Sequence, residues 1–417
     1  MASRIDLQQP VLDDALHSIN FFNGRLLSAR DLTLEQSAYR EADRRLGRAM
    51  GDGIADGLEV SIAPDSSKSA PTVRVEAGLA VNRRGDALAL PSRTDVALVR
   101  SSTASSGAAA GFSNCLPIQT GAYIAGAGVH LLTISPAQIT KGRATTSAIN
   151  PAATTCNTDT IVSAVQFRLI QIDSQFTAAE LQDPKHLRNL IAYRCFGAAG
   201  TAAFIANPFG NETTQRGLLD DLRPNQLTDC EVPLAVLYWT EADGINFIDM
   251  WSVRRRIVRQ SAGNKWSTVL SDDLAAEGEA RFYQFLDEAV GLATGANPES
   301  IVAREHFFFL PSAGVIPLST PSSKRFDYLT FFNGITYREP VYLDGARVEK
   351  LLRDSWSYAP VDLASGEMFW LYWVRENAQA ILGSPAVETC LIFASGQMPF
   401  AALPKFDVAH WDFSNYV

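Results

Sequence analysis

The chain has 417 residues, of which 47% are hydrophobic and 19% are charged, so it has enough apolar material for packed cores and is not disordered throughout. This length suggests about two or three domains. Lys and Arg total 36 against 45 Asp and Glu, and the net charge of −9 argues against a general attraction to nucleic acid or to an anionic membrane.

The N-terminal region predicts a long amphipathic helix after an arm without a targeting signal. Two columns of residues recur at seven-residue spacing: Leu32, Tyr39 and Leu46, with Glu35, Ala42 and Ala49 beside them. Arginines occupy the other side, and the pattern predicts about six helical turns. Ser28 and Asp31 form an approximate capping box at its start, and Gly51 ends it.

Two further properties of the sequence bear on where the protein is found. Residues 1–6 lack the apolar core of a signal peptide, and the weakly polar run 122–134 is too short to span a bilayer. We therefore expect synthesis in the cytoplasm, no direct membrane span, and a place in a particle that is cytoplasmic, membrane-anchored or released.

The next part of the chain predicts β structure. Alternating residues in 72–76 and 79–90 predict strands, with a hairpin turn at 83–86, and 129–134 and 161–172 are also strand-like. The runs 101–114 and 140–159 consist of small and polar residues and are interpreted as flexible insertions. A second hairpin joins 232–239 to 245–251, with Asp243 and Gly244 as a type I′ turn pair.

The remainder predicts helices alternating with buried strands. We expect helices at 179–193, interrupted near Pro184, at 272–292 and at 344–356. The continuous apolar runs 306–310 and 368–374 indicate strands covered on both faces.

The predicted architecture is mainly β (α+β). It has two or more β-sandwich or barrel-like domains, an N-terminal amphipathic helix and a few linking helices. We divide the chain into an arm and helix (1–60), a β-rich domain (61–270), and a helix followed by an aromatic-rich β domain (271–417).

No chemical motif stands out. The sequence lacks the phosphate-binding, dinucleotide-binding, zinc-protease and nucleophile-elbow patterns, and its five histidines are dispersed. We therefore predict no catalytic residue, no metal and no cofactor. The five cysteines are also far apart: Cys195 and Cys230 are expected to be buried free thiols, and a Cys115–Cys156 bridge is left open.

Three short segments are candidates for interaction. Arg254, Arg255 and Arg256 follow Trp251, and they form either a solvated edge or an ion-pairing patch for an acidic neighbour. The motif Phe-Phe-Asn-Gly occurs twice, at 21–24 and at 331–334. For both phenylalanine pairs we favour core burial over a surface anchor. The candidate interaction residues are therefore Phe21, Phe22, Arg25, Arg254, Arg255, Arg256, Phe331 and Phe332.

Several stretches resemble a known group of proteins. Residues 19–32, 75–88 and 232–239 with 247–255 are similar to phage-tail-like proteins encoded with contractile injection systems, near the baseplate genes. The resemblance implies a structural subunit, baseplate-associated or cage-like around the spike. It also implies a homo-oligomer with baseplate, spike or sheath subunits as partners.

An alternative from a different class is a carbohydrate-binding or carbohydrate-cleaving β-sandwich protein. Trp266, Trp411 or Tyr416 would then stack on sugar rings. Two carboxylates about 5 to 10 Å apart in an aromatic-lined groove would favour this alternative.

Overall fold

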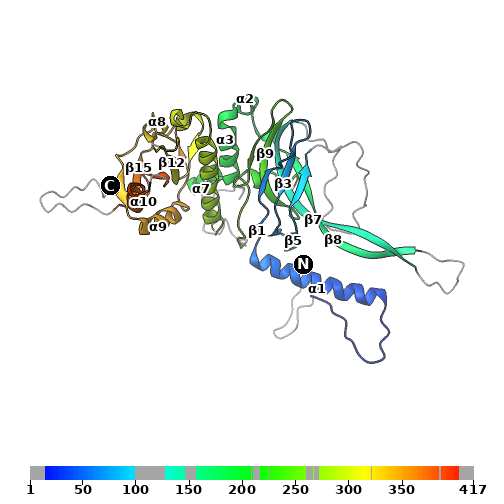
Figure 1. Cartoon of the computed structure of the whole chain (residues 1–417). Helices are drawn as coiled ribbons and strands as arrows, with labels where there is room; N and C mark the ends of the chain where they lie inside the picture. The colour runs from blue at the N-terminus through cyan, green and yellow to red at the C-terminus, as the bar shows by residue number, and fades with distance from the viewer. Residues whose placement is uncertain are drawn as a thin grey trace, which may run out of the picture.

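The computed structural model describes residues 15–98, 127–145, 156–207, 209, 217–223, 225–259, 266, 272–320, 322–384 and 387–402. Helices make up 33% and strands 32% of the structure, so the fold is α+β with several small sheets. The predicted α+β class is therefore confirmed, although helices are as abundant as strands and the fold is not mainly β. Figure 1 shows two groups of sheets with helices between them.

Helix α1 (Ala29–Met50) leads into the first group of sheets. The Ser28 side chain accepts a hydrogen bond from the Asp31 backbone, and the Asp31 side chain accepts one from the Ser28 backbone, which completes a capping box. Gly51 ends the helix with a φ of 110°. In Figure 1, α1 lies beneath the sheets at one end of the molecule.

Two three-stranded antiparallel sheets follow α1. The first contains β1 (Gly53–Gly57), β4 (Gly78–Val81) and β5 (Ala87–Leu90); the second contains β2 (Val60–Ile62), β3 (Thr72–Val75) and β6 (Thr94–Ala97). The hairpin predicted around 83–86 is confirmed as β4 and β5, with Gly78 opposite Leu90.

A four-stranded sheet lies over these two. Its order is β10 (Gly244–Asp249), β9 (Val232–Thr240), β7 (Gly128–Thr145) and β8 (Cys156–Gln171). The β9–β10 hairpin is confirmed, but Gly244 pairs with Thr240, so the turn has three residues. Only Gly244 of the predicted turn pair has a positive φ, and a type I′ turn is therefore wrong.

The long β7–β8 hairpin corrects another prediction. Segment 140–159 was interpreted as a flexible insertion, yet residues 140–145 belong to β7 and residues 156–159 belong to β8, with Thr145 opposite Cys156. The described ranges do not include 146–155. Small and polar residues can form such paired strands because backbone pairing does not require apolar side chains. The other predicted insertion, 101–114, lies outside the described residues.

The four-stranded sheet is covered on both faces. Leu132, Leu234 and Leu237 pack with residues of the two small sheets, such as Val73 and Leu88, in one core cluster. A second cluster packs the opposite side, which includes Val129 and Val236, against helix α3 (Pro184–Phe196). Along β7 the alternation follows from the period of two along a strand, whereas a register shift in β9 between Pro233 and Ala235 places Leu234 on the same side as Leu237.

Helices connect this part to the C-terminal part. The helix predicted around 179–193 is confirmed as α2 (Ala178–Leu181) and α3 (Pro184–Phe196), divided before Pro184. The helix predicted from residue 272 is confirmed as α7 (Asp272–Ala293). The intervening elements are η2 (Asp173–Gln175), α4 (Ala198–Ala206) and α5 (Leu218–Asp221).

The C-terminal part is built around a mixed four-stranded sheet. Its order is β12 (Ala313–Leu318), β16 (Thr389–Ser395), β15 (Phe369–Val374) and β13 (Val341–Leu343), with β13 parallel to β15. The remaining elements are η3 (Pro298–Ser300), η4 (Ala303–Glu305), β11 (Phe309–Leu310), α8 (Tyr328–Phe331), η5 (Gly345–Arg347), α9 (Val348–Ser355), β14 (Val361–Asp362) and α10 (Arg375–Gly383). Segment 306–310 was predicted as a strand, but only its last two residues pair, because η4 precedes them.

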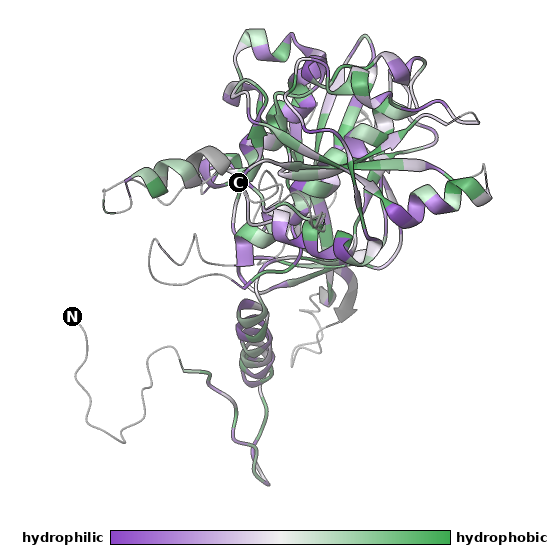
Figure 2. Cartoon of the chain, turned by 90° about the vertical axis from the view of Figure 1, so that its left-hand side faces the viewer, coloured by the Kyte–Doolittle hydropathy of each residue, from purple (hydrophilic) through white to green (hydrophobic). Residues whose placement is uncertain are grey.

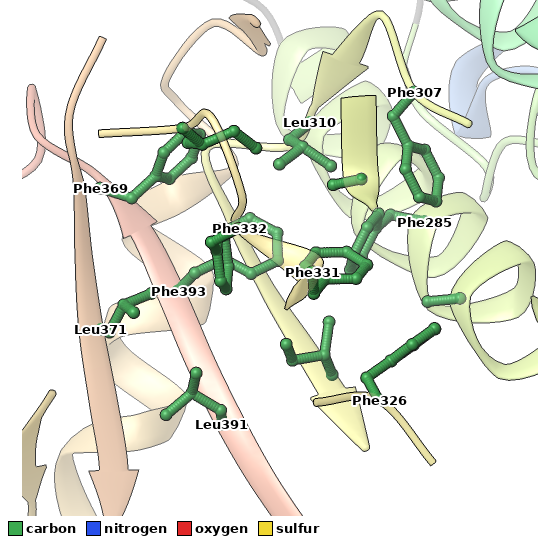
Figure 3. Close-up of a cluster of buried hydrophobic side chains, with 14 of the residues drawn as sticks. Phe285, Phe307, Leu310, Phe326, Phe331, Phe332, Phe369, Leu371, Leu391 and Phe393 are labelled. Atoms are coloured by element: carbon green, nitrogen blue, oxygen red, sulfur yellow. The ribbon is translucent and has the colours of Figure 1, made fainter. Parts of the chain in front are cut away.

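Phenylalanine rings fill the space between this sheet and α7. Phe285 of α7 meets Phe393 of β16 edge-to-face at a centroid distance of 5.2 Å. Phe331 and Phe332 lie in the same cluster, as Figure 3 shows. Edge-to-face ring packing of this kind adds stability beyond the apolar area that is buried.

Candidate functional site

Exposed hydrophobic side chains are concentrated in one short part of the molecule. Of the large hydrophobic side chains that are exposed among the described residues, ten of 23 lie between Leu16 and Met50. They belong to the segment 15–28, here called the N-terminal arm, and to α1. A concentration of this kind marks an interaction surface more often than scattered exposed residues do.

The way α1 is docked explains why its apolar side faces solvent. A Cβ atom on Gly47 would lie 2.2 Å from the carbonyl oxygen of Gly85, so the two backbones touch there. Arg44 beside it forms an ion pair with Asp86 at 2.6 Å. The helix therefore turns a glycine and an arginine toward the body, and its apolar residues point elsewhere.

Leu32, Tyr39 and Leu46 form what we call the α1 stripe. Their exposed fractions are 50%, 66% and 66%, and Gly47 is the one buried residue of the helix. Figure 2 shows α1 projecting from the rest of the chain, next to the N-terminal trace. The large residues of the seven-residue pattern thus face solvent in the described chain, while Glu35 of the second column is half-buried.

The N-terminal arm has an ordered turn. Arg25 forms an ion pair with Asp31 at 3.0 Å and donates a hydrogen bond to the Asn20 carbonyl oxygen at 2.9 Å. Hydrogen bonds from the side chain and backbone of Ser28, together with the smaller effect of Arg25, lower the pKa of Asp31 to about 2. Arg25 therefore positions the arm at the start of α1.

The two Phe-Phe-Asn-Gly copies differ in burial. Phe21 and Phe22 are 55% and 62% exposed, so core burial is wrong for this pair, and their role as a surface anchor stays a prediction. Phe331 and Phe332 are fully buried in the phenylalanine core, and they are wrong as candidates for a surface contact.

The arginine run is mostly internal. Arg254 donates hydrogen bonds to the carbonyl oxygens of Gly57 and Leu58, and Arg255 donates to those of Trp251 and Ser252. An ion-pairing patch for an acidic neighbour is therefore wrong for these two residues. They fasten their own segment to the chain around them.

The third arginine of the run is different. Arg256 is partly exposed and pairs with Glu279 of α7 at 3.0 Å. It lies at the surface, but its charge is used within the chain.

A buried polar cluster, which the sequence analysis missed, lies where α3 meets α7 and the end of β10. Arg188 contacts Asp249 at 2.8 Å and Asp287 at 2.5 Å. Gln284 donates hydrogen bonds to Asp249 at 3.0 Å and to Glu288 at 2.7 Å. The residues of α7 in this cluster recur at helical spacing, and that polar stripe is the signal that could have revealed it.

Glu288 is the unusual member of this cluster. Burial raises its pKa to about 7, although Arg188 acts in the opposite direction. Burial also disfavours the charge on Arg188, but Asp249 and Glu288 outweigh it and raise the pKa of Arg188. The cluster therefore contains a carboxyl group that titrates near neutral pH inside the structure.

A small hollow lies beside this cluster. It is too small to enclose an ordinary small-molecule ligand, and among its lining residues are Tyr193, Phe196, Arg281, Gln284 and Phe309. No carboxylate lines it, so it does not supply the acid pair of a glycosidase.

The residues proposed for sugar stacking are placed only in part. Trp266 is 40% exposed. Trp411 and Tyr416 lie outside the described residues.

Two further observations concern metal binding and membrane crossing. Within the described ranges, no three His, Cys, Asp or Glu residues gather as they would to hold a metal ion. None of the described helices is both long enough and apolar enough to cross a membrane.

The cysteines differ from the prediction at one position. Cys195 is a buried free thiol, and burial raises its pKa to about 12. Cys230 is disulfide-bonded, so the prediction of a free thiol is wrong there. Cys115 and the side chain of Cys156 lie outside the described part of the chain.

No protein-family model matches the chain, and no curated protein matches it.

Proposed function

We propose that this protein is a non-enzymatic structural subunit that acts through protein–protein contacts. The observation that carries the proposal is the exposed α1 stripe together with the apolar side chains of the N-terminal arm. A soluble chain rarely leaves so many adjacent large apolar side chains uncovered, because each costs free energy in contact with water. Covering them with another protein removes that cost.

The sequence resemblance supports a particular kind of particle. Residues 19–32, which contain most of the arm and the start of α1, are among those similar to the proteins of contractile injection systems. We propose a baseplate-associated or cage-like position around the spike of such a particle. A disulfide-bonded Cys230 is compatible with a particle that is released from the reducing cytoplasm.

Fractionation of the cells that make the protein tests the proposal. We expect the wild-type chain to sediment with large particles and the Tyr39→Glu variant to remain in the slow fraction, because a carboxylate in the stripe opposes burial. Leu382→Glu is the matched control, since Leu382 is 90% exposed on α10, far from α1 in the sequence. A wild-type chain that stays monomeric and degrades a polysaccharide would overturn the proposal.

A further inference from the structure

The α1 stripe has the geometry of a coiled-coil seam. Leu32, Tyr39 and Leu46 recur every seven residues and form a column of large side chains. A second column beside it contains Glu35, Ala42 and Ala49, two of which are small. Columns at this spacing are the two seam positions of a heptad, and a seam of this kind is completed by another helix.

We infer that the α1 stripe binds the α1 stripe of a second copy of this chain, as an antiparallel helix pair. The inference rests on the proposed function and names the partner of its contact surface. In an antiparallel pair, the large column of each copy faces the small column of the other. Leu32 then lies opposite Ala49 of the second copy, and Tyr39 lies opposite Ala42. A parallel pair would place the large side chains against each other.

The distribution of charge along α1 favours the same orientation. The first half of the helix contains Asp31, Glu35 and Arg30, a net charge of −1, and the second half contains Glu41, Asp43 and four arginines, at 40, 44, 45 and 48, a net charge of +2. An antiparallel pair brings the negative half of one copy next to the positive half of the other. A parallel pair would bring the two positive halves together, and like charges across a seam are repulsive.

The antiparallel pair also places an acidic residue of one copy near an arginine of the other. In the antiparallel register, Asp31 of one copy and Arg45 of the second copy flank the seam at neighbouring positions. The Arg45 side chain is 44% exposed and forms an ion pair with Glu41 of its own chain at 3.6 Å.

The N-terminal arm supplies the rest of the contact area. The stripe and Met50 together expose roughly 500 Å² per copy, if a large side chain has about 200 Å² of surface, which is less than the about 800 Å² per partner of a standard interface. The backbone N–H of Ile19 donates to Glu35 at 2.8 Å, so the arm runs beside the second column. Its exposed residues Phe21, Phe22, Leu26 and Leu27 add a similar area.

The mass of the full-length protein in solution tests the pairing. Sedimentation equilibrium of the wild-type chain is expected to give twice the 45.3 kDa of one copy. Tyr39→Glu is expected to give the monomer mass with unchanged helix content, because Tyr39 faces solvent in the single chain. Leu382→Glu is expected to remain a dimer.

Cysteine cross-linking tests the orientation. Leu32→Cys and Ala49→Cys are made as separate variants, oxidised alone and as a mixture, and compared with the wild-type chain, which retains its own cysteines. An antiparallel pair links the two variants only in the mixture. Two Ala49→Cys copies would be about 25 Å apart in that pair, from 17 residues at 1.5 Å each, whereas a parallel pair would join them directly.

These results separate the inference from the proposed function. A monomeric wild-type chain, or a linked product in Ala49→Cys alone, overturns the antiparallel pair. If the same chain still sediments with particles in a Tyr39-dependent way, the proposed function survives and the stripe binds a different subunit. A wild-type dimer, its loss in Tyr39→Glu and linkage only in the mixture support the inference.

Discussion

Replacing Glu288 by Gln is expected to stabilise the protein at alkaline pH. Glu288 is 6% exposed, and the groups that face it are Arg188 of α3, Asp249 at the end of β10, and Gln284 and Asp287 of α7. Burial of its carboxyl group is the dominant effect, and it disfavours the ionised form. Gln has nearly the same shape but carries no charge, so the substitution removes this cost.

The magnitude and sign follow from the pKa. The pKa of Glu288 rises from 4.5 to about 7 on folding, so between these values the folded state holds a proton that the unfolded state has released. The contribution is fully present below pH 4.5 and is lost as the pH rises to 7. At about 1.4 kcal/mol for each pH unit, the loss is about 3 kcal/mol.

Urea denaturation at a series of pH values measures this effect, because urea does not screen charges. The difference in unfolding free energy between Glu288→Gln and wild type should grow from near zero at pH 4 to about 3 kcal/mol at pH 8, in favour of the variant. Glu305→Gln is the matched control, since the Glu305 side chain is 59% exposed, and it should change by less than about 0.5 kcal/mol. A Glu288→Gln variant less stable than wild type at pH 8 would refute the reasoning, because ionised Glu288 would then be a net stabilising partner of Arg188.

Three other perturbations have defined outcomes. Gly47→Leu should displace α1 from the body, because even a Cβ atom at that position would lie 2.2 Å from a backbone oxygen. Proteases should then cut α1 roughly tenfold faster than in wild type. Gly291→Leu is the control and should not change the rate, since a Cβ atom there has no neighbouring atom within 4 Å. Arg168→Met should lower the unfolding free energy, measured by urea denaturation, by about 3 to 5 kcal/mol, because it leaves the buried Glu231 without the arginine that pairs with it at 2.6 Å. The double variant Arg168→Met, Glu231→Gln should recover most of this stability. Cys230→Ser should lower the unfolding free energy by about 2 to 5 kcal/mol, because it removes the disulfide that Cys230 forms. A reductant should then lower the stability of this variant no further. A further loss of stability in reductant would contradict the assignment of the stabilising disulfide to Cys230.

The two Phe-Phe-Asn-Gly copies show what the sequence can and cannot predict. In both copies the glycine has a positive φ, 90° at Gly24 and 75° at Gly334, so the local turn is encoded by the motif. The exposure of the phenylalanines differs completely between the copies. Burial depends on which elements pack around the motif, and that information lies far away in the sequence.

The same distinction explains the candidate sites. The α1 pattern predicted the helix and its cap, but the docked side is determined by Gly47 meeting Gly85, which are 38 residues apart. The arginine run was predicted to be either a solvated edge or an ion-pairing patch because its residues are adjacent, whereas the folded chain directs Arg254 and Arg256 to different partners within the chain. The buried cluster around Glu288 was missed because polar residues on a helix usually face water.

The close glycine contacts at the base of α1 bear on how a paired subunit would behave. Cβ atoms on Gly51 and Gly53 would lie 1.9 Å and 2.6 Å from the carbonyl oxygens of Val258 and Arg256, and Gly47 meets Gly85 in the same way. Backbone pairing of Asp52 with Val258 and of Ile54 with Arg256 adds to these contacts. Helix and body are therefore joined by short backbone contacts on several sides rather than by a free linker, and such a junction fixes the direction of α1.

If two copies pair through α1, the angle between their bodies is fixed as well. A closed symmetric assembly requires that property, because a two-fold contact with a variable angle would not place every copy equivalently.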